Sequence, residues 1–453
     1  MNAAEVVRRI EAGDLSSEEL VRSCLARVEE LEGAVQAWAY LDPELPLQTA
    51  IELDRRRERG ESIGVLQGVP IGVKDIFNTR DMPTQMGSPL WEGFTPGNDA
   101  RVVEKLRWAD GIVMGKTHTA EFGVHHPSPT RNPYDPQRSP GTSSSGSAAA
   151  VATGMVPLAL GSQTAGSTIR PASYCGIYGF KPSFGLVPRT AVLKTTDRLD
   201  HVAFMARSVE DMKLVFDLAR VSGRNYPFVR RALDQAAQEP SGLEDWRVRL
   251  VRGPKWSEAE PYAREALEEF ARRVSSLDRV CVYEKELPDT FSRIHDAHER
   301  MYCRMLAYYF QEESSHPDKL SSIFSSMVER GRTVTLEDYQ EDADFQAERV
   351  VELEQEFHDC DVILTLAAAG EARVGLETRD RPDNCLLWTF CGVPSLSIPS
   401  NVGPNGLPLG VQIVGAKHND YSLLAFAELL VTEGLATNQG PYPSLPESVR
   451  DTV

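Results

Sequence analysis

The sequence predicts an α/β fold, and two features of its 453 residues indicate it. From residue 64 to about residue 220, short apolar runs broken by glycine alternate with stretches of helical periodicity. Apolar and glycine-rich sequence returns over residues 360–435. Such alternation is typical of helices packed against a β-sheet. Because no repeat, low-complexity tract or linker divides the chain, we expect a single domain over residues 1–453.

The first elements of this domain are predicted from local patterns. The N-terminal 35 residues should be helical, because Ser16 and Glu19 have the spacing of a capping box and apolar residues then recur on one face. Further along, we expect strands at residues 69–76, 111–116 and 156–160, and helices at residues 100–108 and 147–153.

Residues 221–345 have a different character. They are charged and poor in glycine, with helical stretches such as 263–274 and 291–311, and we interpret them as a helical cover over one face of the sheet. Strands at residues 362–366, 394–399 and 409–414 should then complete the core, which we place at residues 64–220 and 360–435.

The composition excludes several classes of partner. Lys and Arg total 48 against 66 Asp and Glu, and a net charge of -18 repels phosphate backbones, so we expect no nucleic-acid partner. No run reaches the roughly 18 to 20 apolar residues that span a bilayer, and the charged N-terminus is unlike a signal peptide. We therefore expect no membrane partner and a cytoplasmic location. The seven cysteines lack a CxxC pair, which fits reduced thiols.

One pair of histidines is a weak candidate for a metal site. His295 and His298 are three residues apart on a predicted helix, beside Asp296. Zinc usually requires a third ligand and a clearer spacing than this pair offers. We expect no metal site.

The tract at residues 140–171 reads PGTSSSGSAAAVATGMVPLALGSQTAGSTIRP and carries the strongest chemical signal. A flexible Ser/Gly linker would lack its helix-forming alanine run and its apolar strand. Two Ser/Gly turns, one before a helix and one after a strand, are instead expected to converge. Consecutive backbone N–H groups in such a turn can stabilise an oxyanion. The candidate donors are Thr164, Ala165, Gly166 and Ser167.

A serine nucleophile needs a base, and neither turn contains a histidine. Lys74 lies in the apolar run at residues 69–76. Burial there would lower its pKa and make the neutral amine accessible as a general base. The alternatives are a surface lysine and a lysine that only pairs with Asp75.

The two turns resemble the amidase signature, in the segments GTSSSGSAAAVA at 141–152 and GSQTAGSTIRPA at 161–172. Segments NPYDP at 132–136, GKTHTAEF at 115–122 and CGIYGFKP at 175–182 are similar to family segments as well. The resemblance implies one α/β domain with a large mixed sheet between helical layers. It also implies an amidohydrolase that needs no metal or organic cofactor, and a homodimer.

The resemblance further implies a Ser-Ser-Lys triad. Lys74 would deprotonate Ser143, which follows a cis peptide bond, and Ser143 would relay the proton from the nucleophile Ser167. The family's spacing of 24 residues between the two serines selects Ser143 over its neighbours. We therefore predict an acyl-enzyme at Ser167.

Three positions depart from the usual signature. Thr142 and Ala165 stand where glycine is usual, and we expect the turn at Ala165 not to be left-handed. Arg170 lies three residues after Ser167, as in malonamidase-like and carboxybiuret-hydrolase-like members, in which an arginine holds a substrate carboxylate. The alternative is that Arg170 pairs with a nearby acid and holds the turn.

We therefore predict cleavage of a small-molecule amide, which carries a carboxylate if Arg170 binds substrate. An acyl or amide transferase with an amine acceptor, and a catalytically impaired binding protein on the same scaffold, remain as alternatives. A nucleotide-binding loop at residues 111–117, GIVMGKT, is disfavoured because it is one residue short of the phosphate-binding motif.

Overall fold

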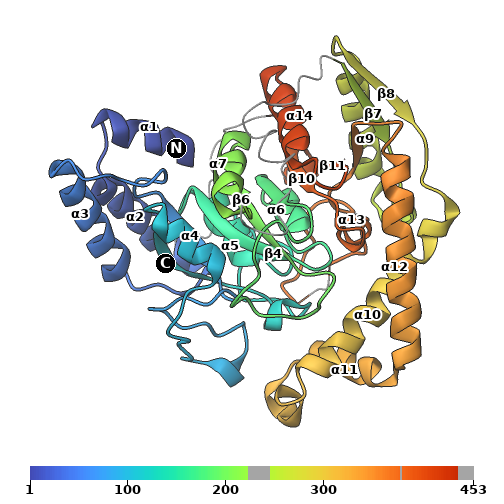
Figure 1. Cartoon of the computed structure of the whole chain (residues 1–453), viewed down its shortest axis with the longest axis horizontal. Coiled ribbons are helices and arrows are strands. Elements are labelled where there is room, and N and C mark those ends of the chain that lie inside the picture. Colours follow the sequence, from blue (N-terminus) through green and yellow to red (C-terminus); the bar gives the residue numbers. More distant parts are fainter. Residues whose placement is uncertain (223–244, 378–379, 437–453) are drawn as a thin grey trace.

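The computed structural model describes residues 1–222, 245–377 and 380–436 (Figure 1). These residues form one α/β domain around an eleven-stranded mixed sheet, as predicted. In chain order the strands are β1 (Trp38–Tyr40), β2 (Pro70–Lys74), β3 (Ile112–Thr117), β4 (Leu158–Gln163), β5 (Tyr178–Lys181), β6 (His201–Ala206), β7 (Trp246–Leu250), β8 (Val280–Glu284), β9 (Val362–Leu366), β10 (Ser395–Val402) and β11 (Pro408–Gly415).

The sheet has two parallel groups joined by antiparallel strands. The strand order is β1-β3-β2-β4-β6-β5-β10-β11-β9-β7-β8. Strands β3, β2 and β4 run parallel to one another, as do β9, β7 and β8, while β6, β5, β10 and β11 lie antiparallel between them. The carboxyl ends of β3, β2 and β4 therefore meet at one edge, which is where open α/β sheets bind ligands.

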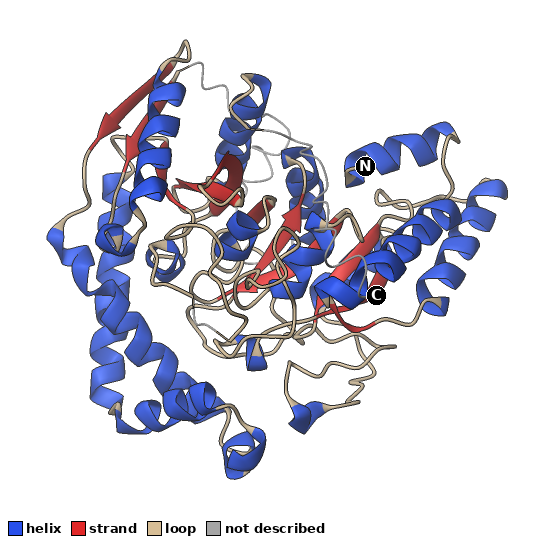
Figure 2. Cartoon of the chain, turned by 180° about the vertical axis from the view of Figure 1, so that it is seen from behind, coloured by secondary structure: helices blue, strands red, loops and turns tan. Residues whose placement is uncertain are grey.

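Helices cover both faces of the sheet (Figure 2). Helices α4, α7 and α14 pack together against one face, and α5 and α6 contact the same strands from the other. The helices are α1 (Ala3–Ala12), α2 (Ser17–Val35), α3 (Glu44–Glu58), α4 (Arg101–Trp108), α5 (Ser145–Ala152), α6 (Ile169–Tyr174), α7 (Val209–Ala219), α9 (Pro261–Ser275), α10 (Ile294–Tyr309), α11 (Ser322–Thr333), α12 (Leu336–Glu356), α13 (Cys385–Phe390) and α14 (Asp420–Thr432).

The N-terminal helical prediction is confirmed with one break. Helix α1 ends at Gly13, whose φ of 80° is left-handed, and α2 begins after Ser16 with the predicted Ser16–Glu19 capping box. Within the described residues every helix is too short or too polar to cross a membrane.

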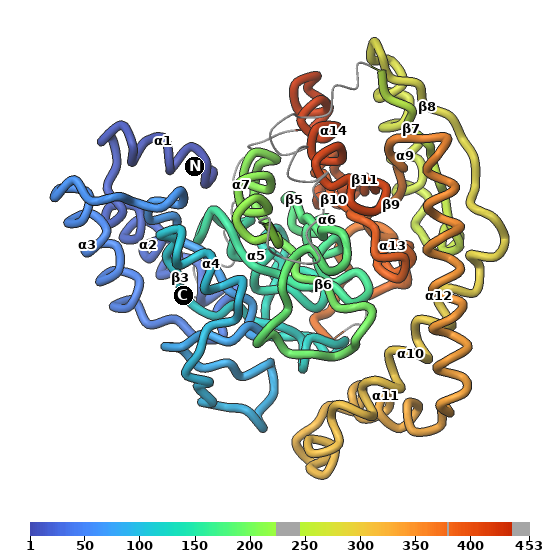
Figure 3. Tube along the Cα trace, viewed as in Figure 1, coloured from blue at the N-terminus to red at the C-terminus, as the bar shows by residue number. Residues whose placement is uncertain are grey.

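The prediction that residues 221–345 form only a helical cover is wrong in part. Strands β7 and β8 come from this segment and extend the sheet beside β9. Strand β7 was not predicted because it contains arginines, which are typical of exposed positions. Arg249 is nevertheless fully buried, because it forms an ion pair with Glu356 at 2.6 Å. Helix α9 packs against β8 and β9, while α10, α11 and α12, the last of which ends at Glu356, form an arm beside the sheet (Figure 3). Residues 223–244 of the predicted cover lie outside the described residues.

Helix α5 is short and buried along its whole length, which brings its first turn close to the strand ends. A Cβ on Gly146 would lie 2.3 Å from the carbonyl oxygen of Ala37 and 2.5 Å from the backbone nitrogen of His118. Only glycine permits this approach. The serines that precede and open α5 are thereby held at the carboxyl edge of β2 and β3.

Candidate active site

Lys74 is the last residue of β2, and its side chain joins three segments at this edge of the sheet. Its Nζ lies 2.7 Å from Ser143 Oγ and 3.0 Å from Ser144 Oγ, in the turn before α5. It also lies 2.7 Å from Ser162 Oγ, on the parallel neighbour β4. The structure thus brings the predicted Lys74 and Ser143 into direct contact.

The surroundings of Lys74 favour its neutral form. The side chain is fully buried, and among the described residues it forms no ion pair. Burial lowers the pKa of Lys74 well below its ordinary value of 10.5, and the charge of Asp200 opposes this only in part. Asp75 pairs instead with Lys116, at 3.0 Å. Both alternatives, a surface lysine and a pair with Asp75, are therefore wrong.

The two serine-rich turns meet in space. The bond between Thr142 and Ser143 is cis, as the resemblance implied. The next residue, Ser144, donates its backbone N–H to the carbonyl oxygen of Ser167 at 3.2 Å. Both serines are buried, Ser167 with 8% of its surface exposed and Ser143 with none.

The turn at residues 164–167 carries four backbone N–H groups that find no acceptor within the described parts of the chain. The following two N–H groups, of Thr168 and Ile169, both donate to Gln163 Oε1 at 2.9 and 3.0 Å. Ala165 has no positive φ, so the prediction that this turn is not left-handed is confirmed. Four unpaired donors in sequence form the kind of nest that binds an anionic oxygen.

The carbonyl groups of the same turn are held from outside. His298 of α10 donates from Nε2 to the carbonyl oxygen of Thr164 at 2.8 Å, and burial lowers the pKa of His298 to about 4. Thr389 of α13 donates its hydroxyl to the carbonyl oxygen of Ala165 at 2.7 Å. The N–H groups are therefore fixed in orientation by side chains more than 100 residues away in sequence.

The family model described as Amidase matches residues 19–424 of this chain. The chain belongs to the amidase family. It is 30% identical to a glutamyl-tRNA(Gln) amidotransferase subunit of Natranaerobius thermophilus, over 93% of each chain. It is also 30% identical to the putative amidase AmiD of Mycobacterium bovis, over 94% of this chain and 92% of that protein.

A solved structure shares the amidase fold over its full length. That structure, of a vestigial protein complex linked to the origins of an s-triazine catabolic enzyme, is 26% identical with a TM-score of 0.87. The match covers 97% of this chain and 100% of that one. As an amidase, the chain is an enzyme that acts on carbon–nitrogen bonds.

Arg170 of this amidase is already paired with protein carboxylates. Its Nε donates to Asp383 at 2.6 Å and its Nη1 to Asp380 at 3.0 Å. Burial alone would lower the pKa of Arg170, but Asp383 and Asp380 raise it well above its ordinary value. Asp380 also accepts hydrogen bonds from the backbone N–H and the hydroxyl of Thr142, both at 2.8 Å. These contacts favour the alternative in which Arg170 holds the turn.

The histidine pair and the glycine-rich loop have other roles. His295 donates from Nε2 to the carbonyl oxygen of Asp383 at 3.0 Å, and His298 has the contact described above. In the described ranges no group of three metal-ligating side chains comes together. The segment at residues 111–117, which was disfavoured as a nucleotide loop, forms buried strand β3 and does not wrap a phosphate.

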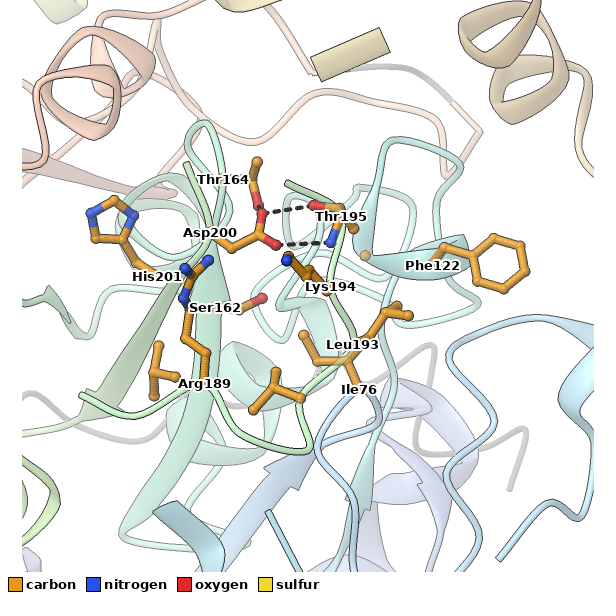
Figure 4. A pocket seen from close by; sticks show the side chains of 13 residues that line it. Ile76, Phe122, Ser162, Thr164, Arg189, Leu193, Lys194, Thr195, Asp200 and His201 are labelled. Atoms are coloured by element: carbon orange, nitrogen blue, oxygen red, sulfur yellow. Dashed lines mark hydrogen bonds between the residues drawn. The ribbon is translucent and has the colours of Figure 1, made fainter. Parts of the chain in front are cut away.

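Two cavities flank the turn of the amidase. One, of about 350 Å³, is bordered by Ala165 and Arg170 together with residues of α10 and α11, among them His298 and Met327. The other, of about 230 Å³, lies beside Ser162 and Thr164 and is closed by apolar side chains such as Leu193 (Figure 4). The arm that contains α10 thus forms one wall of the larger cavity.

Sequence reasoning missed several residues of this site. Ser162 escaped notice because the predicted strand stopped at residue 160, whereas β4 continues to Gln163. The parallel register of β2 and β4 places Ser162 beside the end of β2, which is the signal that could have found it. Asp380 and Asp383 had no local signal, because their partner Arg170 lies more than 200 residues earlier.

Proposed function

We propose that this amidase hydrolyses a small linear amide through an acyl-enzyme at Ser167, with Ser143 and Lys74 as the proton relay and base. The observation that carries the proposal is a buried lysine without an ion pair among the described residues, 2.7 Å from Ser143 Oγ. A neutral amine so placed can accept a proton, which is what a weakly nucleophilic serine requires.

In the proposed reaction, Ser167 Oγ attacks the amide carbon while its proton passes to Ser143 and the proton of Ser143 passes to Lys74. The oxyanion accepts hydrogen bonds from the free N–H groups of residues 164–167. The Lys74 ammonium then returns a proton through Ser143 to the leaving amine, and the C–N bond breaks. Water attacks the resulting ester by the same route and releases the acid.

The proposed substrate is a small amide for which a carboxylate is not required. Arg170 pairs with both Asp380 and Asp383, so the three groups together carry one excess negative charge. A substrate carboxylate would be repelled unless it displaced one of these aspartates. We infer that Arg170 anchors Asp380, and through it the backbone at Thr142, rather than the substrate.

A second candidate function is transfer of the acyl group to an amine or ammonia. It is favoured by the 30% identity to an amidotransferase chain over 93% of this one. Hydrolysis and transfer share the same acyl-enzyme and differ only in the acceptor. The rate of acid formation without an added amine separates them, because a hydrolase needs only water whereas a transferase needs its acceptor.

A fluorophosphonate probe tests the proposal without knowledge of the substrate. Wild-type protein should form a covalent adduct, measured by the mass of the intact chain and mapped to Ser167, and Ser167→Ala should form none. Ser145→Ala is the matched control, because the Ser145 hydroxyl bonds Ser128 at 2.6 Å rather than Lys74.

Ammonia release from a panel of small amides, with and without a carboxylate, then defines the substrate for wild type and Arg170→Lys. An unlabelled wild-type chain would support the binding-protein alternative.

A further inference from the structure

Asp200, the residue before β6, is a carboxylate to which the proposed mechanism gives no role. One oxygen accepts from the hydroxyls of Thr164, Thr195 and Thr196 at 2.8, 2.7 and 3.0 Å. The other accepts from the backbone N–H groups of Thr195 and Thr196 at 2.8 and 2.9 Å. All five donors are neutral, and Asp200 forms no ion pair within the described residues. Its negative charge is therefore fixed in position without being cancelled.

Asp200 faces both halves of the catalytic machinery. Figure 4 shows its carboxylate bonded to Thr164, with Ser162 on the wall of the same cavity. Thr164 begins the turn with the free N–H groups, and Ser162 accepts a hydrogen bond from Lys74. The charge of Asp200 also raises the pKa of Lys74 against the larger lowering caused by burial. A single carboxylate thus acts on the base and on the turn.

The other ionisable groups around the site are paired with each other, neutral or, for the Arg189 cation, bonded to backbone carbonyls. Asp75 and Lys116 pair with each other, and Lys194 pairs with Asp197. Arg189, which borders the cavity, donates to the backbone carbonyls of Thr196 and Asp197 at 3.3 and 2.9 Å. Burial lowers the pKa of His118 to about 4 and that of His201 well below its ordinary value, so both stay neutral near pH 7. Asp200 is left as the charge that acts on Lys74.

We propose that Asp200 is a positioning residue that couples the base to the oxyanion turn. Its fixed charge stabilises the Lys74 ammonium that forms when Ser167 loses its proton. Its hydrogen bond to Thr164 holds the first residue of the turn that receives the oxyanion. This inference rests on the proposed function and adds a residue that the Ser-Ser-Lys scheme does not contain.

The two roles of Asp200 can be separated by two variants. Asp200→Asn removes the charge, and Thr164→Val removes only the hydroxyl that Asp200 binds. The readout is the rate of fluorophosphonate labelling between pH 5 and pH 10. In this reaction Ser167 Oγ attacks phosphorus, fluoride leaves, and the proton passes through Ser143 to Lys74.

The labelling rate should fall on the acidic side of this profile, and we call that fall the acid limb. We expect Asp200→Asn to shift the acid limb to lower pH, because the Lys74 ammonium is no longer stabilised by the negative charge of Asp200. Its plateau rate should fall about tenfold or more, because the hydrogen bonds from Thr164 and its neighbours lose a charged acceptor. Thr164→Val should lower the plateau without moving the limb. Asp200→Ser serves as a second neutral variant if Asp200→Asn does not fold, and thermal unfolding checks each protein.

An acid limb of Asp200→Asn or Asp200→Ser that coincides with that of wild type would overturn the inference. A limb that moves equally in Thr164→Val would do the same, because a purely structural role would then explain both. Failure of the proposed function gives a different result, since wild type and Ser167→Ala would then label alike.

Discussion

Lys74 and Lys116 are two buried lysines on neighbouring parallel strands, and they differ in what their ammonium groups contact. Lys116 of β3 lies 3.0 Å from Asp75, and also donates to Thr84 Oγ1 at 2.7 Å and to the carbonyl oxygen of Pro83 at 3.0 Å. Lys74 contacts three serine hydroxyls, which accept hydrogen bonds from an ammonium and donate to a neutral amine. Burial lowers the pKa of both, so burial alone does not make a base. The partners decide which lysine can exchange a proton.

The strongest way to break this comparison is Lys74→Met, which keeps the length of the side chain and removes the amine. We expect activity to fall by about 100- to 10,000-fold, the usual contribution of a positioned general base. The free energy of unfolding should change less than in a variant that breaks a buried ion pair, because Lys74 loses only its hydrogen bonds to three serine hydroxyls. Steady-state rates on the substrate found in the panel, with urea unfolding, check both statements. A rate within tenfold of wild type would remove Lys74 from the mechanism.

Lys116→Met is the matched change on the neighbouring strand and should act on stability. It leaves the buried Asp75 carboxylate without its partner, which costs about 3 to 5 kcal/mol in comparable pairs. Urea unfolding measures this loss, and the double variant Lys116→Met with Asp75→Asn should recover part of it. Equal stability of Lys116→Met and wild type would show that the ion pair between Lys116 and Asp75 does not stabilise the fold.

The pH dependence sharpens the same contrast. Activity should fall tenfold per pH unit below the pKa of Lys74, because the protonated amine cannot act as a base.

The native state also binds fewer protons than the unfolded state between this lowered pKa and the ordinary value of 10.5. The free energy of unfolding should therefore rise with pH across that window. Urea unfolding of Lys74→Met over the same range should lose this slope, and a retained slope would assign it to another group.

The smallest expected effect belongs to Ser162→Ala. It removes one of the three hydroxyls at Lys74, and a single hydrogen bond contributes about 0.5 to 1.5 kcal/mol, which corresponds to a change in rate of about twofold to twelvefold. Ser147→Ala is the control, because Ser147 donates to the carbonyl oxygen of Leu160 at 2.8 Å and belongs to the same buried region. The labelling rates of the two variants should differ; equal losses would point to packing rather than to Lys74.

Much of the sheet and of the site could be predicted because their signals are local. The run around Lys74 is short, apolar and bounded by glycine, and it forms β2 with its lysine buried at the end. The serine-rich tract similarly predicted β4, α5 and the turn at residues 164–167. Here each element's pattern agrees with its place in the fold, so sequence periodicity is sufficient.

The remaining features depend on contacts between distant segments. Arg170 forms ion pairs with Asp380 and Asp383, and the sequence around residue 170 does not indicate these partners. Strand β7 was missed because its buried Arg249 reads as a solvent-exposed position until Glu356 is placed beside it. In both cases the expected position of an arginine, exposed or buried, depends on whether a carboxylate partner lies beside it.

The position of β10 in the sheet has a consequence for synthesis on the ribosome. Strand β5 ends at Lys181, and its neighbour on one side is β10, which begins only at Ser395. Until translation reaches that point, β5 presents an open hydrogen-bonding edge, which is a site for wrong pairing. Thr389, which holds the turn at Ala165, is also made late. The three proposed triad residues are all present once Ser167 has been made, so the nascent chain carries them well before Thr389 can hold the turn.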